Sequence, residues 1–141
     1  MGIDTLPRLP FPPEGEGKKG IGIHLLLDFY GIAPERLTDA DLLSRALLAS
    51  ARAAKMTPLS APVLHRFPGG GLTGFLPLAE SHIAFHSYPE IGYLAADVFT
   101  CGADPEGPDR AVAILRDALR PGRESVRRFA RGDALREGDS G

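Results

Sequence analysis

The chain has 141 residues, of which 43% are apolar, and it carries a formal net charge of -2. This length suits one domain, the lack of a basic excess excludes a nucleic-acid scaffold, and no apolar run approaches the roughly 20 residues of a membrane-spanning helix. The single cysteine excludes an internal disulfide and favours a reducing, cytoplasmic compartment.

The two ends of the chain differ in composition from its middle. Residues 1–19 combine a proline-rich stretch with glycine and charge, so we expect a disordered extension there. Residues 133–141 are polar and are expected to form a flexible tail. The sequence therefore predicts one folded domain over residues 20–132.

Hydrophobic patterns in this domain predict strands and two helices. Thr38, three residues before Asp41, is a capping pattern that begins an amphipathic helix reaching Lys55, and Pro108 opens a second helix. The expected strands cover residues 24–30, 63–67, 72–78, 81–87, 93–100 and 124–131. These elements predict an α+β fold, a two-layer sandwich in which both helices cover one face of a mainly antiparallel sheet.

Reactive side chains concentrate in one stretch of the chain. It carries the hydroxyl of Ser81, the imidazoles of His82 and His86, the carboxylate of Glu90 and the thiol of Cys101. The remainder of the chain is chemically quiet, so we look for the active site here.

Three interpretations of this stretch are open from the residues alone. His82 and His86, four residues apart, share one face of a strand and would suit a metal site, but an obvious third ligand is lacking. A serine hydrolase would use Ser81 as nucleophile, but the Gly-x-Ser-x-Gly elbow is missing. In the third interpretation, Ser81 attacks its own backbone.

Spaced motifs favour the third interpretation. The core is Glu80-Ser81-His82, with a histidine five residues and a cysteine twenty residues after the serine. Further motifs lie in the segments Gly22-Ile23-His24-Leu25-Leu26-Leu27-Asp28, Tyr30-Gly31, Phe67-Pro68, Leu72-Thr73-Gly74, Pro89-Glu90, Gly92-Tyr93, Asp97-Val98-Phe99-Thr100-Cys101-Gly102 and Arg131-Gly132. In these motifs the chain resembles the prokaryotic S-adenosylmethionine decarboxylases over residues 22–132.

The resemblance implies a proenzyme that cuts itself. Ser81 would attack the carbonyl of Glu80 and turn the peptide bond into an ester, and elimination and hydrolysis would leave a pyruvoyl group on the new N-terminus. The products would be a β chain of residues 1–80 and an α chain of residues 81–141. The pyruvoyl carbonyl would form a Schiff base with the substrate amine and serve as the electron sink for decarboxylation, without a metal.

Roles for individual side chains also follow from the resemblance. His86 is the expected processing base, and Thr73 supplies a hydroxyl that assists processing. Cys101 is the expected proton donor in turnover, since a free thiol is mostly protonated at neutral pH. Phe67 would pack on the adenine of S-adenosylmethionine and Glu90 would contact the ribose. The product would serve spermidine synthesis, and members of the family act as homodimers with sites at or near the subunit interface.

Two alternatives concern substrate and activity. Departures from the family pattern at Pro68-Gly69-Gly70-Gly71-Leu72, Ala84-Phe85 and Ser87-Tyr88 affect the substrate side. Ornithine or arginine therefore stays an alternative substrate for the same scaffold. The alternative of another class is an unprocessed relative that binds a ligand or partner without catalysis.

One geometric difficulty follows from strand periodicity. Strict alternation places Ser81 and His86 on opposite faces, so either a bulge or turn at the cleavage site brings them together or the assignment of His86 is wrong. Of the other histidines, His24 is expected to be a hydrogen-bonded core residue, His65 to be exposed and His82 to have a positional role.

Overall fold

The computed structural model describes residues 21–101 and 104–132. The predicted extension over residues 1–19 and the predicted tail over residues 133–141 lie outside the described residues. The elements in chain order are β1 (Gly22–Tyr30), α1 (Pro34–Leu37), α2 (Ala40–Ala53), β2 (Val63–Arg66), β3 (Leu72–Leu78), β4 (Ser81–Tyr88), η3 (Pro89–Ile91), β5 (Tyr93–Thr100), α3 (Gly107–Leu119) and β6 (Arg123–Arg131). Within the described parts of the chain, no helix is long and apolar enough to cross a membrane.

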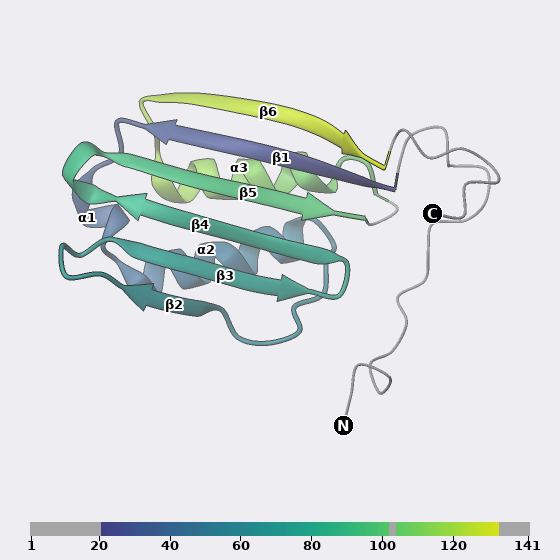
Figure 1. The fold of residues 1–141 in the computed structure, drawn as a ribbon, viewed down its shortest axis with the longest axis horizontal. Helices are drawn as coiled ribbons and strands as arrows, with labels where there is room; N and C mark the ends of the chain where they lie inside the picture. Colours follow the sequence, from purple (N-terminus) through teal and green to yellow (C-terminus); the bar gives the residue numbers. More distant parts are fainter. Residues whose placement is uncertain (1–20, 102–103, 133–141) are drawn as a thin grey trace.

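The strands form one antiparallel sheet in the order β2-β3-β4-β5-β1-β6 (Figure 1). The first strand, β1, therefore lies between β5 and the last strand, β6. Strand β4, which carries the reactive stretch, is paired with β3 on one side and β5 on the other. Its pairing with β5 runs without interruption from Ser81, opposite Thr100, to Tyr88, opposite Tyr93.

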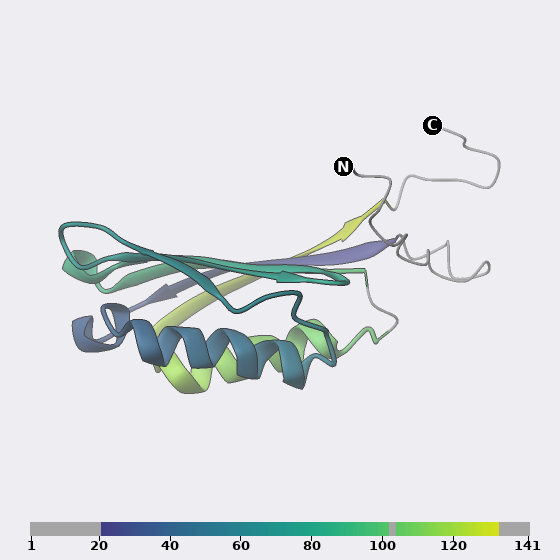
Figure 2. The same cartoon turned by 90° about the horizontal axis from the view of Figure 1, so that it is seen from below.

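Both long helices cover the same face of the sheet (Figure 2), which confirms the predicted two-layer α+β sandwich. Each helix buries an apolar stripe, with Leu43 and Leu47 in α2 and Val112 and Leu115 in α3. The largest fully buried side chains are Phe29, Leu25, Leu27, Leu37, Leu43, Leu47, Leu72, Leu76, Ile83, Leu94, Leu119 and Val98. We call the opposite side of the sheet, which neither helix covers, the open face.

The start of α2 differs from the sequence prediction, whereas α3 begins at Gly107–Pro108 as predicted. Helix α2 begins after Asp39, whose carboxylate accepts a hydrogen bond from the N–H of Leu42 at 3.0 Å, so the N-cap is Asp39 and the expectation of Thr38 was wrong. Thr38 instead ends α1. The short elements α1 and η3 were not predicted, because three or four residues are too few to show a helical period.

A buried serine holds the end of β4 next to His86. The Oγ of Ser87 accepts a hydrogen bond from the N–H of Leu72 at 2.8 Å and donates one to the carbonyl of Leu37 at 2.7 Å. Because this buried hydroxyl both donates and accepts a hydrogen bond, it connects α1, β3 and β4. This end of the β3–β4 pair is therefore a firm support for the neighbouring His86.

Candidate active site

The turn between β3 and β4 carries the bond that the sequence predicts to break. Ala79 and Glu80 form this two-residue turn. The carbonyl oxygen of Glu80 accepts two hydrogen bonds from Cys101, one from the backbone N–H at 3.2 Å and one from Sγ at 2.8 Å. We call Glu80, Ser81 and Cys101 the cleavage-site group. Two donors on one carbonyl oxygen polarise the carbonyl and are placed to stabilise an oxyanion there.

A second group of predicted residues gathers at the other end of β4. His86 and Thr73 are cross-strand partners, and Nδ1 of His86 lies 2.9 Å from Oγ1 of Thr73. Both line a cavity of about 520 Å³ whose wall also includes Phe67 and Glu90. We call Phe67, Thr73, His86 and Glu90 the His86 group. A cavity of this size is typical of small-molecule sites.

Within one chain the two groups do not meet. Ser81 and His86 are five positions apart on an uninterrupted strand, which corresponds to about 16 Å, and they lie on opposite faces of the sheet. The predicted bulge is therefore wrong, because both neighbouring strands pair with β4 in regular register. The structure brings together Glu80 with Cys101 and Thr73 with His86, but it does not bring Ser81 to His86.

The exposure of Phe67 and Glu90 fits a binding surface better than a structural role. Phe67 is 48% exposed although it is a large apolar residue, and its ring lies edge-on to the exposed His65, with 4.7 Å between centroids. Glu90 lies on η3 at the rim of the same cavity and is exposed. The prediction that His65 is exposed is confirmed.

Comparison with known proteins connects this geometry to one family. A sequence profile of the family described as S-adenosylmethionine decarboxylase matches residues 23–132. This chain belongs to the S-adenosylmethionine decarboxylase family. The match spans both the cleavage-site group and the His86 group, so all the residues predicted to act lie within it.

Individual members of the S-adenosylmethionine decarboxylase family cover most of the chain. A protein of Parasynechococcus marenigrum (strain WH8102), named S-adenosylmethionine decarboxylase proenzyme, is 44% identical over 111 residues, covering 79% of this chain and 85% of that protein. A proenzyme of the same name from Thermoplasma acidophilum is 37% identical over 118 residues, covering 84% and 88%. The crystal structure of the adenosylmethionine decarboxylase from Aquifex aeolicus superposes with a TM-score of 0.77 at 32% identity, covering 87% of this chain and 98% of that one.

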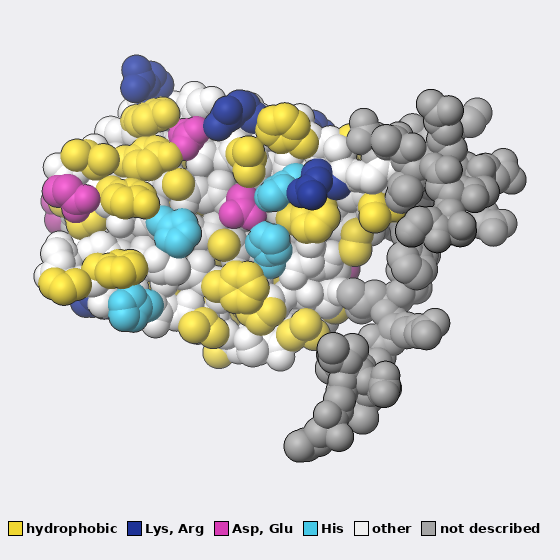
Figure 3. Space-filling model, in the orientation of Figure 1, with side chains coloured by type: hydrophobic (Ala, Val, Ile, Leu, Met, Phe, Trp, Pro, Cys, Tyr) yellow, Lys and Arg dark blue, Asp and Glu magenta, His cyan; other side chains and the backbone are white. Residues whose placement is uncertain are grey.

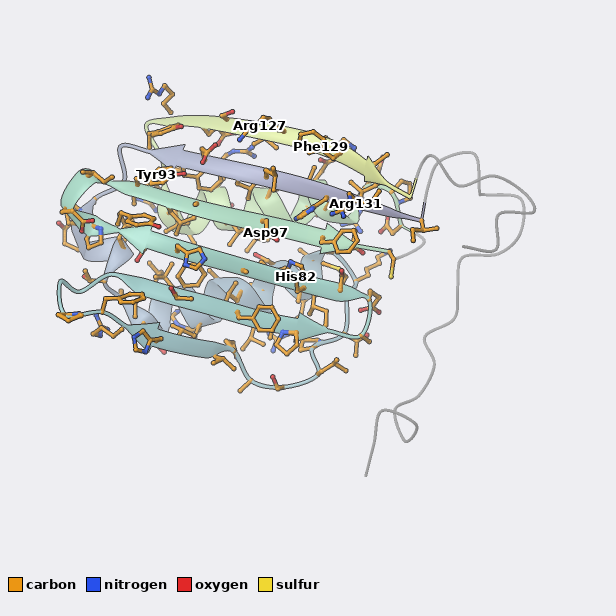
Figure 4. All side chains as sticks on the ribbon, viewed as in Figure 1. His82, Tyr93, Asp97, Arg127, Phe129 and Arg131 are labelled. Atoms are coloured by element: carbon orange, nitrogen blue, oxygen red, sulfur yellow. The ribbon has the colours of Figure 1, made fainter. Side chains whose placement is uncertain are left out.

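Residues outside the predicted site form a network on the open face (Figure 4). Oδ1 of Asp97 lies 3.1 Å from Nε2 of His24 and 2.7 Å from Nε2 of His82, and Arg131 approaches Nδ1 of His24 at 3.1 Å. His24 is therefore hydrogen-bonded as predicted, but it lies half-buried on the open face and the expectation of a core position was wrong. His82 is held by Asp97, which agrees with a positional role.

The same network bears on the metal interpretation. His82 joins His24 and Asp97, whose ligand atoms lie within 4.8 Å of one another, and His86 is not part of this cluster. A guanidinium can only donate, so Nδ1 of His24 accepts from Arg131 and Nε2 carries the hydrogen that Asp97 accepts. A metal at Nε2 would require the other tautomer, with two donors facing each other. As placed in the structure, these side chains form a hydrogen-bond network.

A second polar cluster on the open face lies near the start of β5. The hydroxyl of Tyr93 donates to Oδ1 of Asp28, and Arg127 approaches Oδ2 of Asp28 at 3.5 Å (Figure 4). The hydrogen bond to Asp28, aided by burial, raises the pKa of Tyr93 to about 12. The ring of Tyr93 is stacked between those of Tyr30 and Tyr88, with centroids 5.3 and 5.5 Å away. Sequence reasoning missed this cluster, although alternation along β1 and β5 gives these residues the same face.

Proposed function

We propose that this chain is an S-adenosylmethionine decarboxylase that first cleaves its own backbone between Glu80 and Ser81. The observation that supports this most directly is the pair of hydrogen bonds that Cys101 donates to the carbonyl oxygen of Glu80. Ser81 must attack the carbon of this same carbonyl. Cleavage there divides the 141 residues into a β chain of residues 1–80 and an α chain of residues 81–141. Sheet pairing keeps the pieces together, because β1 of the first piece lies between β5 and β6 of the second.

The cleavage chemistry is balanced without an external oxidant or reductant. Oγ of Ser81 bonds to the carbonyl carbon of Glu80 while the C–N bond breaks, and the hydroxyl proton passes through a base to the freed nitrogen. Removal of the Cα proton of residue 81 then expels the Glu80 carboxylate and leaves an unsaturated residue. Addition of water and loss of ammonia produce the pyruvoyl group. An imidazole suits these proton transfers near neutral pH, and we assign them to His86.

The residues around position 81 fit a pyruvoyl group. Residue 81 is held by its pairing with Thr100 at the end of the sheet, and Sγ of Cys101 already lies 2.8 Å from the carbonyl oxygen that precedes it. When present, the group supplies an electron sink for the loss of carbon dioxide. The part of this chain is to hold the substrate against it and to deliver a proton, which we assign to the Cys101 thiol.

We place substrate recognition in the cavity of the His86 group. An exposed aromatic face at Phe67 suits both an adenine ring and a sulfonium cation, and the carboxylate of Glu90 at the rim suits hydroxyl groups of a ribose. The relatives are named for S-adenosylmethionine, and none of the comparisons supports ornithine or arginine. The product, an aminopropyl donor, would serve spermidine synthesis, and we expect the enzyme to act in the cytoplasm.

We further propose that two copies of the chain complete each site. The open face carries large exposed apolar side chains (Figure 3), among them Val63, Phe75, Tyr88 and Phe129. A two-fold axis lying between two such faces and running across the strands reverses β4, so the Ser81 end of one copy meets the His86 end of the other. Ser81 is half-buried at the end of its strand. This homodimer removes the separation of about 16 Å along β4, although the side chain of Ser81 itself points to the helix-covered face.

The test is the intact mass of freshly purified protein, followed by an activity assay. We expect the two fragments in place of a 15.0 kDa chain, a single uncut chain for Ser81→Ala, and release of carbon dioxide from S-adenosylmethionine but not from ornithine or arginine. An uncut wild-type chain with an unmodified Ser81 would contradict the proposal and favour a relative that only binds.

A further inference from the structure

Glu80 is held by two sets of hydrogen bonds in the uncut chain. Its carbonyl oxygen accepts hydrogen bonds from Cys101, as described above. Its carboxylate is held by Thr57, whose backbone N–H lies 2.9 Å from Oε1 and whose hydroxyl lies 3.2 Å from Oε2. Both carboxylate oxygens are therefore engaged by one residue, which follows α2 and lies 23 positions away in the chain.

The turn that contains Glu80 depends on such outside support. Two-residue hairpins favour turns with positive φ at their central residues, which Gly or Asn supply. The non-glycine residues with positive φ in the described parts of the chain are Lys55 and Arg120, so Ala79 and Glu80 do not adopt that conformation. Instead the N–H of Ala79 donates to the carbonyl of Thr57 at 2.8 Å.

The loop that provides this support is itself firmly placed. The N–H of Met56 donates to the carbonyl of Ala51 at 2.8 Å at the end of α2, and the Met56 side chain is only 6% exposed. Directly after Thr57, Pro58 forms an isolated bridge with Leu78. Thr57 is thus fixed by the core before it and by strand β3 after it.

We propose that Thr57 is a positioning residue for self-cleavage, which rests on the proposed function of this chain. By holding both carboxylate oxygens, Thr57 fixes the rotation of residue 80 and keeps its carbonyl oxygen pointing at the N–H and thiol of Cys101. The carbonyl carbon is then polarised and oriented for attack by Ser81. A misplacement of about 1 Å at a reacting carbonyl is enough to slow a reaction about 100-fold.

The position of the cleaved bond adds a second consequence. Thr57 and Glu80 both belong to the β chain, whereas Cys101 belongs to the α chain. After cleavage Thr57 therefore retains the new C-terminus at residue 80, and the turnover chemistry at residue 81 no longer depends on it. Loss of the Thr57 contact should therefore slow cleavage and leave turnover unchanged, which a general structural role would not do.

The experiment measures the rate at which freshly synthesised proenzyme converts into its two fragments, by gel or intact mass over time. We expect Thr57→Val to slow conversion about fivefold, because the hydroxyl is lost while the backbone N–H remains. Thr57→Ser should convert at the wild-type rate. Ser60→Ala is the matched control in the same loop, since its hydroxyl donates only to the carbonyl of the adjacent Ala61. Once conversion is complete, turnover per cleaved site should equal that of the wild type in all three variants.

A double-mutant cycle guards against an indirect effect on folding. Glu80→Ala removes both acceptors and should slow conversion more than Thr57→Val, and the double variant should be no slower than Glu80→Ala alone. Additive slowing, or a Thr57→Val variant that converts as fast as the wild type, would overturn the inference while the proposed function stands. A wild-type chain that never converts would overturn both.

Discussion

The hydroxyl of Thr73 and Nδ1 of His86 lie 2.9 Å apart across the β3–β4 pair. One ring nitrogen of His86 is therefore hydrogen-bonded to a residue of the neighbouring strand. If His86 acts as a base, Nε2 must be free to accept a proton, and Nδ1–H must then donate to Oγ1 of Thr73. The hydroxyl of Thr73 can accept from Nδ1–H in that tautomer, and the hydrogen bond orients the imidazole.

Replacing Thr73 should therefore slow self-cleavage without stopping it. We expect Thr73→Val to lower the cleavage rate about tenfold, since one hydrogen bond that orients a base is lost, and Thr73→Ser to restore most of it. The measurement is the pH profile of cleavage for both variants. A Thr73→Val variant with an unchanged rate and profile would show that His86 does not need this partner.

Changes at Cys101 should separate cleavage from turnover. A serine in its place keeps the backbone N–H and a hydroxyl donor for the Glu80 carbonyl, so we expect Cys101→Ser to cleave within about tenfold of the wild-type rate. A hydroxyl is a far weaker acid than a thiol, so carbon dioxide release per cleaved site should fall at least about 100-fold. Equal losses in both steps would contradict two distinct roles for the thiol.

Local patterns and long-range contacts differ in how far the sequence reveals them. Once the two-residue turn at Ala79 and Glu80 is recognised, the hairpin register makes Thr73 the partner of His86 by counting. The positions of strands and of the two long helices likewise follow from local periodicity. The contact of Asp97 with His24 depends instead on β1 lying beside β5, and no local pattern encodes that strand order.

The separation of Ser81 from His86 shows a second limit of sequence reasoning. Alternation along a strand gives the opposite faces correctly, but the assumption that both residues act within one chain leads to a bulge that is not present in β4. Periodicity describes a single chain, so a site completed by a second copy, as we propose, would leave no signal in the hydrophobic pattern. The hydrogen bonds between Thr57 and Glu80 also had no signal in the sequence, because they join a loop to a turn.

A glycine beneath an aromatic ring should be essential for packing of the β3–β4 pair. Gly74 is the cross-strand partner of Phe85, and a Cβ on Gly74 would overlap the Phe85 ring, which is 2% exposed. We expect Gly74→Ala to lower the free energy of unfolding by about 1–3 kcal/mol, measured in urea. Gly69→Ala, whose Cβ would meet nothing within 4 Å, should change it by less than about 0.5 kcal/mol. Equal effects would contradict the packing argument.

Stability at alkaline pH should depend on Tyr93. The pKa of its hydroxyl is raised from 10.0 to about 12 because the protonated form donates to Asp28. The folded state thus binds this proton more tightly than the unfolded chain, so the stabilisation is complete below pH 10 and is lost as the pH rises towards 12. Tyr93→Phe should cost about 1 kcal/mol at pH 8, and the gap to wild type should narrow above pH 10. A difference titration at 295 nm that shows this phenol ionising near 10 would refute the assignment.

Mixed dimers provide the sharpest test of a site shared between two chains. A Ser81→Ala chain still carries the His86 group, and a His86→Ala chain still carries Glu80, Ser81 and Cys101. If each site takes the cleavage-site group from one copy and the His86 group from the other, a mixed dimer contains one intact site. We therefore expect the His86→Ala chain, uncut when made alone, to be cleaved when it is co-expressed with a tagged Ser81→Ala chain. Cleavage should stay below about half of all chains, and Ser81→Ala should never be cut, because its nucleophile is missing.

If His86→Ala stays uncut in a mixed dimer confirmed by the tag, the base and the nucleophile must act within one chain. Strand β4 would then have to leave the regular register observed between Ser81 and Tyr88.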